Sequence, residues 1–298
     1  MQHQARKRFG QNFLHDPGVI RRILDAVNAE PGQHLVEIGP GQGAITAGLL
    51  EMAGALDVIE LDRDLIGPLA ERFGGLVIHN ADALSFELCA LLRSDPCKTS
   101  PSSGLSELQS RASLLASSMP TAQSQHQSTE HRLRLIGNLP YNISTPLLFR
   151  FIDQADCIED MHLMLQKEVV NRMTAEPGTK VYGRLSVMVQ TFCSAQRLFL
   201  VSAGAFHPAP KVSSAVVRLR PHRPLPYPLA DPSWHARIVA AAFAQRRKTL
   251  RNSLSGLVAP EQISAQGIDP GARAETLSVA DFAALANATS ACIDAQIP

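Results

Sequence analysis

The tetrapeptide Asn138-Leu139-Pro140-Tyr141 combines a side-chain amide, a backbone carbonyl and an aromatic face in one stiff turn. The side-chain oxygen of Asn138 and the carbonyl oxygen of Pro140 could each accept a hydrogen bond from one of the two N–H groups of a planar amine such as that of adenine. An amine that attacks a methyl group becomes tetrahedral and more acidic, so acceptors placed for that geometry favour the transition state. Tyr141 could stack on the base. The alternative is a structural Asn-Pro turn with a core tyrosine.

A glycine-rich turn, EIGPGQG at 37–43, lies between a buried strand and a helix. Glycine lets the backbone approach a ligand closely and adopt positive φ. The glycines alternate as GxGxG, which differs from the dinucleotide pattern GxGxxG that seats a pyrophosphate. The turn therefore indicates a nucleoside or nucleotide site at the carboxyl end of a strand, although a simple tight turn could use the same glycines.

Acidic residues end the next two predicted strands. Glu60 lies 21 residues after Gly39, where a carboxylate can accept both hydroxyls of a ribose, and Asp82 could accept from an adenine amino group. Each acid alone could equally be a helix N-cap or a solvated turn residue. Three consecutive strand ends with suitable polar groups favour an adenosine-containing ligand. Because no pyrophosphate cradle is present, we expect S-adenosylmethionine.

A second proline-rich loop, FHPAPKV at 206–212, carries an aromatic ring and a cation. Phe206 could press on the other face of a flipped base, with Lys211 on a phosphate. A proline-stiffened connection with a buried phenylalanine is the alternative.

Basic residues concentrate late in the chain, although the formal net charge is only +1. From 197 to 253 there are ten basic residues and one acidic residue, whereas 23–95 has three basic and twelve acidic residues. A long helix predicted at 234–254 would place Arg247 and Arg251 on one face at i, i+4. With Arg246 and Lys248 beside them and no acid in the helix, this face indicates phosphate binding, to which RKRF at 6–9 could add. The alternative is a charged surface that contacts only solvent and binds no phosphate.

Alternating strands and helices position these motifs. Helical spacing predicts a helix at 17–29 with Asp16 as its N-cap and Pro17 in its first turn. Strands are expected near 34–38, 56–62, 75–82, 133–141 and 160–166, with helices at 44–53, 64–73, 144–153 and 167–175. This order implies an α/β fold with a parallel sheet covered on both faces. Two further strands, 197–202 and 214–221, are expected to pair antiparallel at the sheet edge.

Two segments interrupt the pattern. Residues 94–131 are rich in Ser, Gln and Thr and are far longer than usual connections, which predicts a flexible surface insertion. Residues 221–232 are rich in proline and predict a linker. We therefore expect a Rossmann-like domain at 1–222 and a small all-α domain at 223–298.

Composition excludes several classes of protein. Hydrophobic residues make up 45% of the 298, so wholesale disorder is excluded. Neither an apolar run of membrane-spanning length nor a signal peptide is present. The cysteines are scattered without a CxxC pair, which argues against a metal site and a disulfide scaffold and favours a reduced, cytoplasmic setting. No dimerisation motif is evident, so a monomer is expected. The five cysteines are at 89, 97, 157, 193 and 292.

Eight separated blocks together resemble the KsgA-type ribosomal RNA adenine N6-dimethyltransferases. These blocks are GQNFL (10–14), EIGPGQG (37–43), VIELDRD (58–64), GNLPYNISTPLLF (137–149), MLQKEVVNRM (164–173), YGRLSV (182–187), FHPAPKVSSAVVRL (206–219) and QRRKTLRNSL (245–254). The resemblance covers nearly the whole chain in order except 94–131, whose role it leaves open.

The resemblance implies a Rossmann-like methyltransferase domain with a small helical RNA-binding domain. It implies that four methyl groups pass from S-adenosylmethionine to two adjacent adenosines near the 3′ end of small-subunit (16S) rRNA, during assembly of that subunit. Tyr141 and Phe206 match residues that contact the base. Residues that match the family's cofactor site are Asn12, Leu14, Gly39, Glu60, Asp82 and Asn138.

Three other functions stay open. A sister enzyme that methylates large-subunit rRNA and confers macrolide resistance would share the cofactor site, but YGRLSV, FHPAPKV and the tyrosine of NLPY favour the small-subunit substrate. A ribosome-assembly factor that mainly binds RNA would suit the basic segment, and both roles could coexist. A nicotinamide oxidoreductase is disfavoured because no GxGxxG is present.

Overall fold

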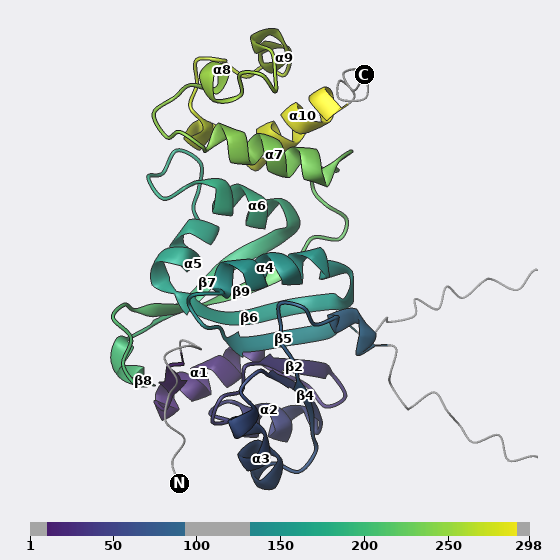
Figure 1. Cartoon of the computed structure of the whole chain (residues 1–298), viewed down its shortest axis with the longest axis vertical. Coiled ribbons are helices and arrows are strands. Elements are labelled where there is room, and N and C mark those ends of the chain that lie inside the picture. Colours follow the sequence, from purple (N-terminus) through teal and green to yellow (C-terminus); the bar gives the residue numbers. More distant parts are fainter. Residues whose placement is uncertain (1–10, 93–131, 291–298) are drawn as a thin grey trace, which may run out of the picture.

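A mixed sheet of seven strands forms the centre of the computed structural model, which describes residues 11–92 and 132–290 (Figure 1). The strand order is β4-β3-β2-β5-β6-β9-β7, in which the first five are parallel and β9 runs antiparallel to both of its neighbours, β6 and β7. The strands are β2 (His34–Ile38), β3 (Leu56–Glu60), β4 (Leu76–Asn80), β5 (Leu133–Asn138), β6 (Ile158–Gln166), β7 (Cys193–Val201) and β9 (Ser214–Pro221). The predicted parallel sheet and its antiparallel edge are confirmed.

Helices cover both faces of the sheet. Side chains of α1 and α2 share one hydrophobic cluster with the sheet, and side chains of α4 and α5 share another. The helices of this part are α1 (Pro17–Val27), α2 (Thr46–Ala53), α3 (Arg63–Arg72), α4 (Ser144–Asp153), α5 (Lys167–Met173) and α6 (Arg184–Phe192). Short 3-10 turns lie at Leu88–Ala90 (η2), Ala155–Cys157 (η4) and Ala203–Ala205 (η5). The fold class and the alternation of strands and helices therefore agree with the sequence pattern.

The first helix shows how local chemistry sets an element's bounds. The side chain of Asp16 accepts from the backbone N–H of Val19 at 2.9 Å, and Pro17 occupies the first turn. Asn28 ends the helix in the left-handed conformation with φ +44°. The predicted cap and start are confirmed.

A two-stranded ribbon closes over the sheet beside α1. β1 (Phe13–Leu14) pairs antiparallel with β8 (Phe206–His207), so segments far apart in the chain lie side by side (Figure 1). Leu14 and Phe206 both point into the core beneath this ribbon. The ribbon thereby fixes the start of the described chain against the FHPAPKV loop.

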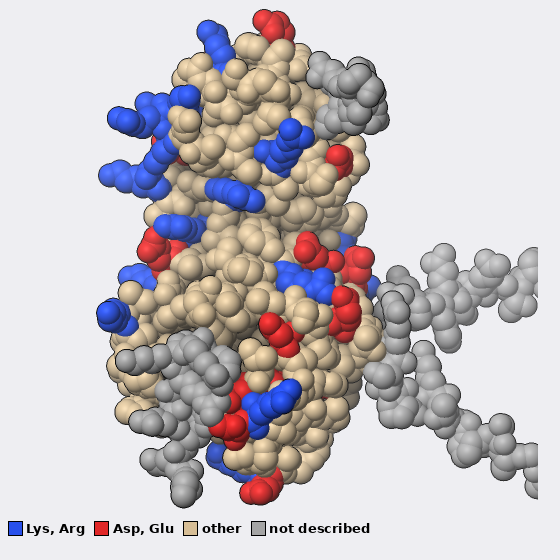
Figure 2. Space-filling view, in the orientation of Figure 1, with Lys and Arg blue, Asp and Glu red and all other residues tan. Residues whose placement is uncertain are grey.

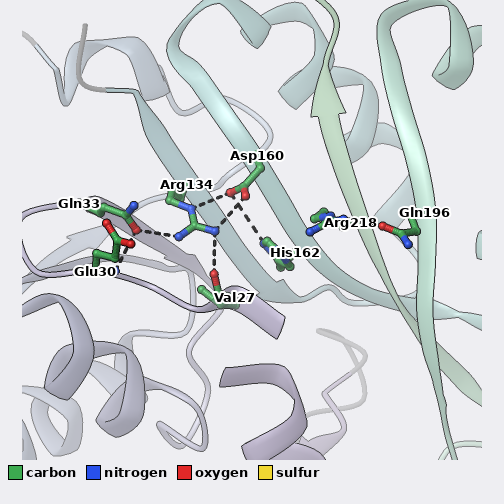
Figure 3. A network of polar contacts seen from close by, with 8 residues as sticks. All are labelled: Val27, Glu30, Gln33, Arg134, Asp160, His162, Gln196 and Arg218. Atoms are coloured by element: carbon green, nitrogen blue, oxygen red, sulfur yellow. Dashed lines mark hydrogen bonds and ion pairs between the residues drawn. The ribbon is translucent and has the colours of Figure 1, made fainter. Parts of the chain in front are cut away.

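A buried arginine locks the amino ends of the strands. The Arg134 guanidinium donates to both carboxylate oxygens of Asp160 at 2.9 Å each, and also to the Val27 carbonyl and the Gln33 side chain, each at 2.7 Å (Figure 3). These bonds join β5 to β6 and to the end of α1. Because every charge is paired, the burial of this network is compensated.

The C-terminal helices pack on α6 rather than forming a separate core. Trp234, Ile238 and Phe282 share a hydrophobic cluster with Tyr182 and Met188, which flank or belong to α6. The helices are α7 (Pro232–Ala242), α8 (Leu250–Ser253), α9 (Pro260–Ala265) and α10 (Val279–Ser290), with a 3-10 turn η6 (Ala274–Thr276). The helical character of this region agrees with the sequence, whereas the boundary at 222/223 stays a prediction.

The long helix expected at 234–254 is wrong. α7 ends at Ala242, turns follow, and α8 starts only at Leu250. The backbone N–H groups of Leu250 and Arg251 donate to the carbonyls of Ala272 and Pro270, so this stretch bonds to a segment about twenty residues later. Arg247 therefore lies in a turn and does not share a helix face with Arg251.

One cysteine pair departs from the expected reduced setting. Cys89, in η2, and Cys157, in η4, form a disulfide with an S–S distance of 2.16 Å across 68 residues of chain. The pair meets because the η2 turn packs against η4 at the start of β6. Among the described residues this bridge is accompanied by one free cysteine, Cys193, which is buried.

Several expectations fall outside the described residues. The insertion at 94–131 and the basic RKRF at 6–9 both lie there. Within 11–92 and 132–290, no helix is long and apolar enough to cross a membrane, and no group of His, Cys, Asp or Glu could hold a metal ion.

Candidate functional site

A cavity of about 250 Å³ opens at the carboxyl ends of β2, β3 and β5. Its volume is near the lower end of the usual range for small-molecule pockets. Eight of the nine residues predicted for catalysis or cofactor binding line it. They are Asn12, Leu14, Gly39, Glu60, Asp82, Asn138, Pro140 and Tyr141, and Phe206 is the exception. Glu37 and Gly41 of the glycine-rich turn, which had no predicted role, line the cavity as well.

The glycine-rich turn forms the wall above β2. Gly39 has φ +66° and its N–H donates to the Ile59 carbonyl at 2.9 Å, so the turn is tied to β3. A Cβ built on Gly39 meets no atom within 4 Å, which leaves its backbone open to a ligand. At Gly43 a Cβ would lie 2.5 Å from the Phe73 ring. The glycines therefore serve both ligand approach and packing.

Glu60 is fixed at the end of β3 by two backbone donors. Its carboxylate accepts from the N–H of Gly41 at 3.2 Å and from that of Asp62 at 2.8 Å. Burial raises the pKa of Glu60 above its ordinary value, and these donors oppose the rise. The carboxylate is thus held rigidly at the cavity wall, where a ribose would find two acceptor oxygens.

Asp82 combines the two roles that the sequence left open. One of its carboxylate oxygens accepts from the Leu84 N–H at 2.9 Å and so caps the turn after β4. The residue also lines the cavity, and its second oxygen has no donor among the described residues. A turn cap and a ligand acceptor are therefore compatible in one side chain.

The orientation of the Asn138 amide is set by the N-terminal ribbon. Its Nδ2 donates to the backbone carbonyl of Asn12 at 3.0 Å. That bond leaves Oδ1 as the free acceptor of the amide, because no described residue donates to it. Asn138 pairs with Met164 on β6, so the sheet fixes its backbone as well.

Pro140 and Tyr141 complete the turn after β5. The Pro140 carbonyl accepts from the Ile143 N–H at 3.2 Å, which leaves one of its two lone pairs for a ligand. The hydroxyl of Tyr141 is 2.6 Å from Ser214 Oγ, at the start of β9. Burial raises the pKa of Tyr141, so its hydroxyl stays protonated at neutral pH.

Phe206 does not line this cavity. Its side chain is 2% exposed and packs in the core with Leu14 and Val216. This position agrees with the buried-phenylalanine alternative, and contact with a base stays a prediction. Lys211 lies exposed in the same loop, where a phosphate could reach it.

Two buried titratable residues at the cavity floor had no assigned role. Glu37 accepts from the Thr46 hydroxyl at 2.6 Å, and burial raises its pKa to about 8. His162 has no hydrogen-bond partner on either ring nitrogen, and burial lowers its pKa to about 4. Ile136 pairs with both residues, so the three form one row across β2, β5 and β6. Sequence alone offered no signal for His162, which lies between Met161 and Leu163 in β6.

The predicted phosphate-binding residues are exposed but differ in their partners. Arg247, Lys248 and Arg251 have no carboxylate partner among the described residues. Arg246 instead lies 3.6 Å from a carboxylate oxygen of Glu275, an acid from outside the 234–254 segment. The acid was overlooked because it comes from η6, beyond the segment.

Comparison with known proteins agrees with this geometry. The family model of ribosomal RNA adenine dimethylase matches residues 2–290. A protein named ribosomal RNA small subunit methyltransferase A from Pseudomonas aeruginosa is 50% identical over 96% of this chain and 95% of its own length. The protein of the same name from Marinomonas sp. is 47% identical over 96% of this chain and 95% of its own length.

Solved structures show the same fold at lower identity. A dimethyladenosine transferase from Plasmodium falciparum has a TM-score of 0.67 at 22% identity and covers 92% of this chain and 95% of its own. The 23S rRNA methyltransferase ErmE has a TM-score of 0.64 at 22% identity and covers 94% of this chain and all of its own. These similarities support the architecture, and they do not distinguish between small-subunit and large-subunit rRNA as the substrate.

The fold and the cavity define an S-adenosylmethionine-dependent methyltransferase. The chain belongs to the ribosomal RNA adenine dimethylase family. The residues present fit the methyl donor, since Gly39 leaves open space for a ligand and Glu60 and Asp82 turn acceptors toward the cavity.

Proposed function

We propose that this enzyme dimethylates the N6 amino groups of two adjacent adenosines near the 3′ end of small-subunit rRNA. The identity to proteins named ribosomal RNA small subunit methyltransferase A supports the small-subunit substrate. The observation that carries the chemistry is the Asn138 amide, whose Nδ2 is bound to the Asn12 carbonyl at 3.0 Å. Its Oδ1 is thereby available to accept a hydrogen bond from an amine in the cavity.

The proposed mechanism rests on positioning rather than on a strong base. S-adenosylmethionine supplies an electrophilic methyl group when it is bound. Asn138 Oδ1 and the Pro140 carbonyl oxygen accept hydrogen bonds from the N–H groups of the adenine amine. These hydrogen bonds favour the tetrahedral form of the nitrogen as the new C–N bond develops. Tyr141 stacks on the base and stays neutral. The methylated ammonium is acidic enough to lose its proton without a dedicated base.

Glu60 and Asp82 bind the nucleoside part of the cofactor in this proposal. Glu60 accepts from the ribose hydroxyls, and the second oxygen of Asp82 accepts from the adenine amine of the cofactor. The exposed Lys211, Arg247, Lys248 and Arg251 bind RNA phosphates.

We further propose that the enzyme acts as a monomer, in the cytoplasm, on an assembling small ribosomal subunit. The buried contact between the C-terminal helices and α6 supports a self-sufficient chain, since these helices find their apolar partner within it.

Transfer of labelled methyl groups tests the proposal. Unmethylated small subunits, large subunits and free rRNA are each incubated with the enzyme and labelled S-adenosylmethionine. Label recovered as N6,N6-dimethyladenosine from small subunits alone is the expected result. Label on large-subunit rRNA would instead assign the resistance-type activity, and particle binding without any label would assign an assembly role.

A further inference from the structure

Residues 11–14, called here the strap, are fixed on both sides of the cavity. On one side, Nε2 of Gln11 donates to Oδ2 of Asp62 at 3.0 Å, just after the end of β3. On the other side, the Asn12 carbonyl accepts from Nδ2 of Asn138 at 3.0 Å, at the end of β5. Because β2 lies between β3 and β5, the strap spans the carboxyl end of β2, and all four of its residues line the cavity.

Two further contacts hold the middle and the end of the strap. Both residues of β1 pair antiparallel with β8. A Cβ built on Gly41 would lie 3.2 Å from the Phe13 ring, so this ring packs over the glycine-rich turn. The strap is therefore held along its length, and the Gln11 side chain supplies its attachment on the side of β3.

Asp62 connects the strap to the acid that is proposed to bind the ribose. Asp62 is 2% exposed, and its carboxylate accepts from Gln11 and from the backbone N–H of Asp64, the latter at 3.4 Å. Its own backbone N–H donates to Oε1 of Glu60 at 2.8 Å. One buried residue thus holds the strap with its side chain and the Glu60 carboxylate with its backbone. Asp62 does not line the cavity, so it acts on a ligand through these neighbours.

The chemistry of the contact between Gln11 and Asp62 fixes its direction. An ionised carboxylate only accepts hydrogen bonds, so the amide nitrogen of Gln11 must face Asp62. Figure 2 shows Asp and Glu side chains at the surface of the lower part of the molecule, where α2 and α3 lie in Figure 1. A carboxylate in place of the Gln11 amide would therefore meet Asp62 as a second acceptor, in a region that already carries negative charge.

We propose that the hydrogen bond between Gln11 and Asp62 is a latch that ties the strap to the ribose side of the cavity, which makes Gln11 a positioning residue for methyl transfer. The latch keeps the Asn12 carbonyl where it orients the Asn138 amide. The ribose site and the catalytic amide are thereby coupled through the strap. This inference rests on the proposed function, because it takes the roles proposed there for Glu60 and Asn138.

Exchange of donor and acceptor across the latch tests the inference in the full-length chain. Gln11→Glu should weaken binding of S-adenosylhomocysteine about tenfold and lower kcat on unmethylated small subunits about tenfold, because the strap loses a hydrogen bond to a charged group. Adding Asp62→Asn should bring both values back to within about threefold of the wild type, since the new amide donates to the new carboxylate. Asparagine also preserves the N-cap of α3.

A charge-matched variant separates the latch from a simple charge effect. Gln11→Glu/Glu71→Gln has the same net charge as the rescued variant, but Glu71 is an exposed acid of α3 away from the latch. It should stay as impaired as Gln11→Glu alone. Equal recovery in this control, or no recovery in Gln11→Glu/Asp62→Asn, would overturn the latch, and the latter result would mean that Gln11 contacts the ligand directly.

Gln11→Ala provides a second test that adds no charge. It should show the same tenfold losses at an unchanged Tm, and wild-type values for binding and kcat would overturn the latch. Methyl transfer by the wild type to small subunits is measured alongside. If it occurs and the exchange gives no recovery, only the latch fails; if it is absent, the proposed function fails, and the S-adenosylhomocysteine titrations still decide for or against the latch.

Discussion

The hydroxyl of Tyr141 lies 2.6 Å from Oγ of Ser214, which joins the turn after β5 to the first residue of β9. Ser214 is fully buried, and its backbone pairs with Gln166 of β6 and Val201 of β7. The ring that is proposed to stack on the target base is therefore anchored to the antiparallel edge of the sheet. Its orientation depends on a residue outside the catalytic turn.

Removing either end of this hydrogen bond should slow methyl transfer. Ser214→Ala and Tyr141→Phe should each lower kcat/KM about tenfold, because the ring loses a partner worth about 1.4 kcal/mol. The double variant should be no slower than either single variant, since the same bond is absent in all three. Additive losses, or weakened cofactor binding in Ser214→Ala, would contradict a positioning role.

Glu60→Ala should weaken binding of S-adenosylhomocysteine by roughly 10- to 100-fold. The carboxylate is expected to accept two ribose hydroxyls, and hydrogen bonds to a charged group contribute about 1.5 kcal/mol or more each. Titration calorimetry measures the loss. Glu51→Ala, which removes an exposed acid of α2, is the control. Equal affinities for both variants would exclude Glu60 from the cofactor site.

Glu37 should make the protein less stable as the pH rises. Its folded pKa of about 8 lies above the ordinary value of 4.5, so the folded state binds the extra proton. The associated stability is complete below about pH 4.5 and is lost as the pH rises through 8. Glu37→Gln should therefore show a smaller fall in Tm between pH 5 and pH 8.5 than the wild type.

The Thr46 hydroxyl supplies a matched check on this pH dependence. It donates to Glu37 at 2.6 Å and favours the ionised carboxylate. Thr46→Val should move the midpoint of the wild-type pH dependence upward, because the remaining burial then acts unopposed. If Glu37→Gln and the wild type lose stability in parallel across this range, the buried carboxyl is not the titrating group.

Gly137→Ala should destabilise the protein and disturb the catalytic turn. A Cβ at Gly137 would lie 2.9 Å from the Ile38 carbonyl oxygen, so β2 and β5 would have to separate next to Asn138. Overpacking of this kind typically costs about 1–3 kcal/mol. Gly67→Ala, in α3 with nothing near its added Cβ, should instead stabilise by up to about 1 kcal/mol. Denaturant unfolding compares the two, and equal stability changes would refute the close approach.

Sequence reasoning succeeded where local pattern and site chemistry coincide. The strands that end at or just before Gly39, Glu60, Asp82 and Asn138 are parallel neighbours, so their carboxyl ends meet at one edge and these four residues line one cavity. This inference from parallel strand ends requires no knowledge of the loops between the strands. The cap at Asp16 was equally local.

Features set by distant partners could not be read from the sequence. The apolar spacing of 234–243 continues plausibly into the basic segment, yet Leu250 bonds the Ala272 carbonyl and the helix breaks. Phe206 enters the core because β8 pairs with β1. Likewise, Cys89 and Cys157 are 68 residues apart in the sequence, and the packing of η2 against η4 brings them together.

The most direct test of the central claim is nucleoside analysis of small-subunit rRNA after reaction with wild type and with Asn138→Ala. The account predicts N6,N6-dimethyladenosine with the wild type and a loss of at least about 100-fold in rate for the variant, because one of the two acceptors for the amine is gone. Circular dichroism and cofactor titration verify that the variant is folded. A folded variant that forms dimethyladenosine at the wild-type rate would contradict the proposed role of Asn138.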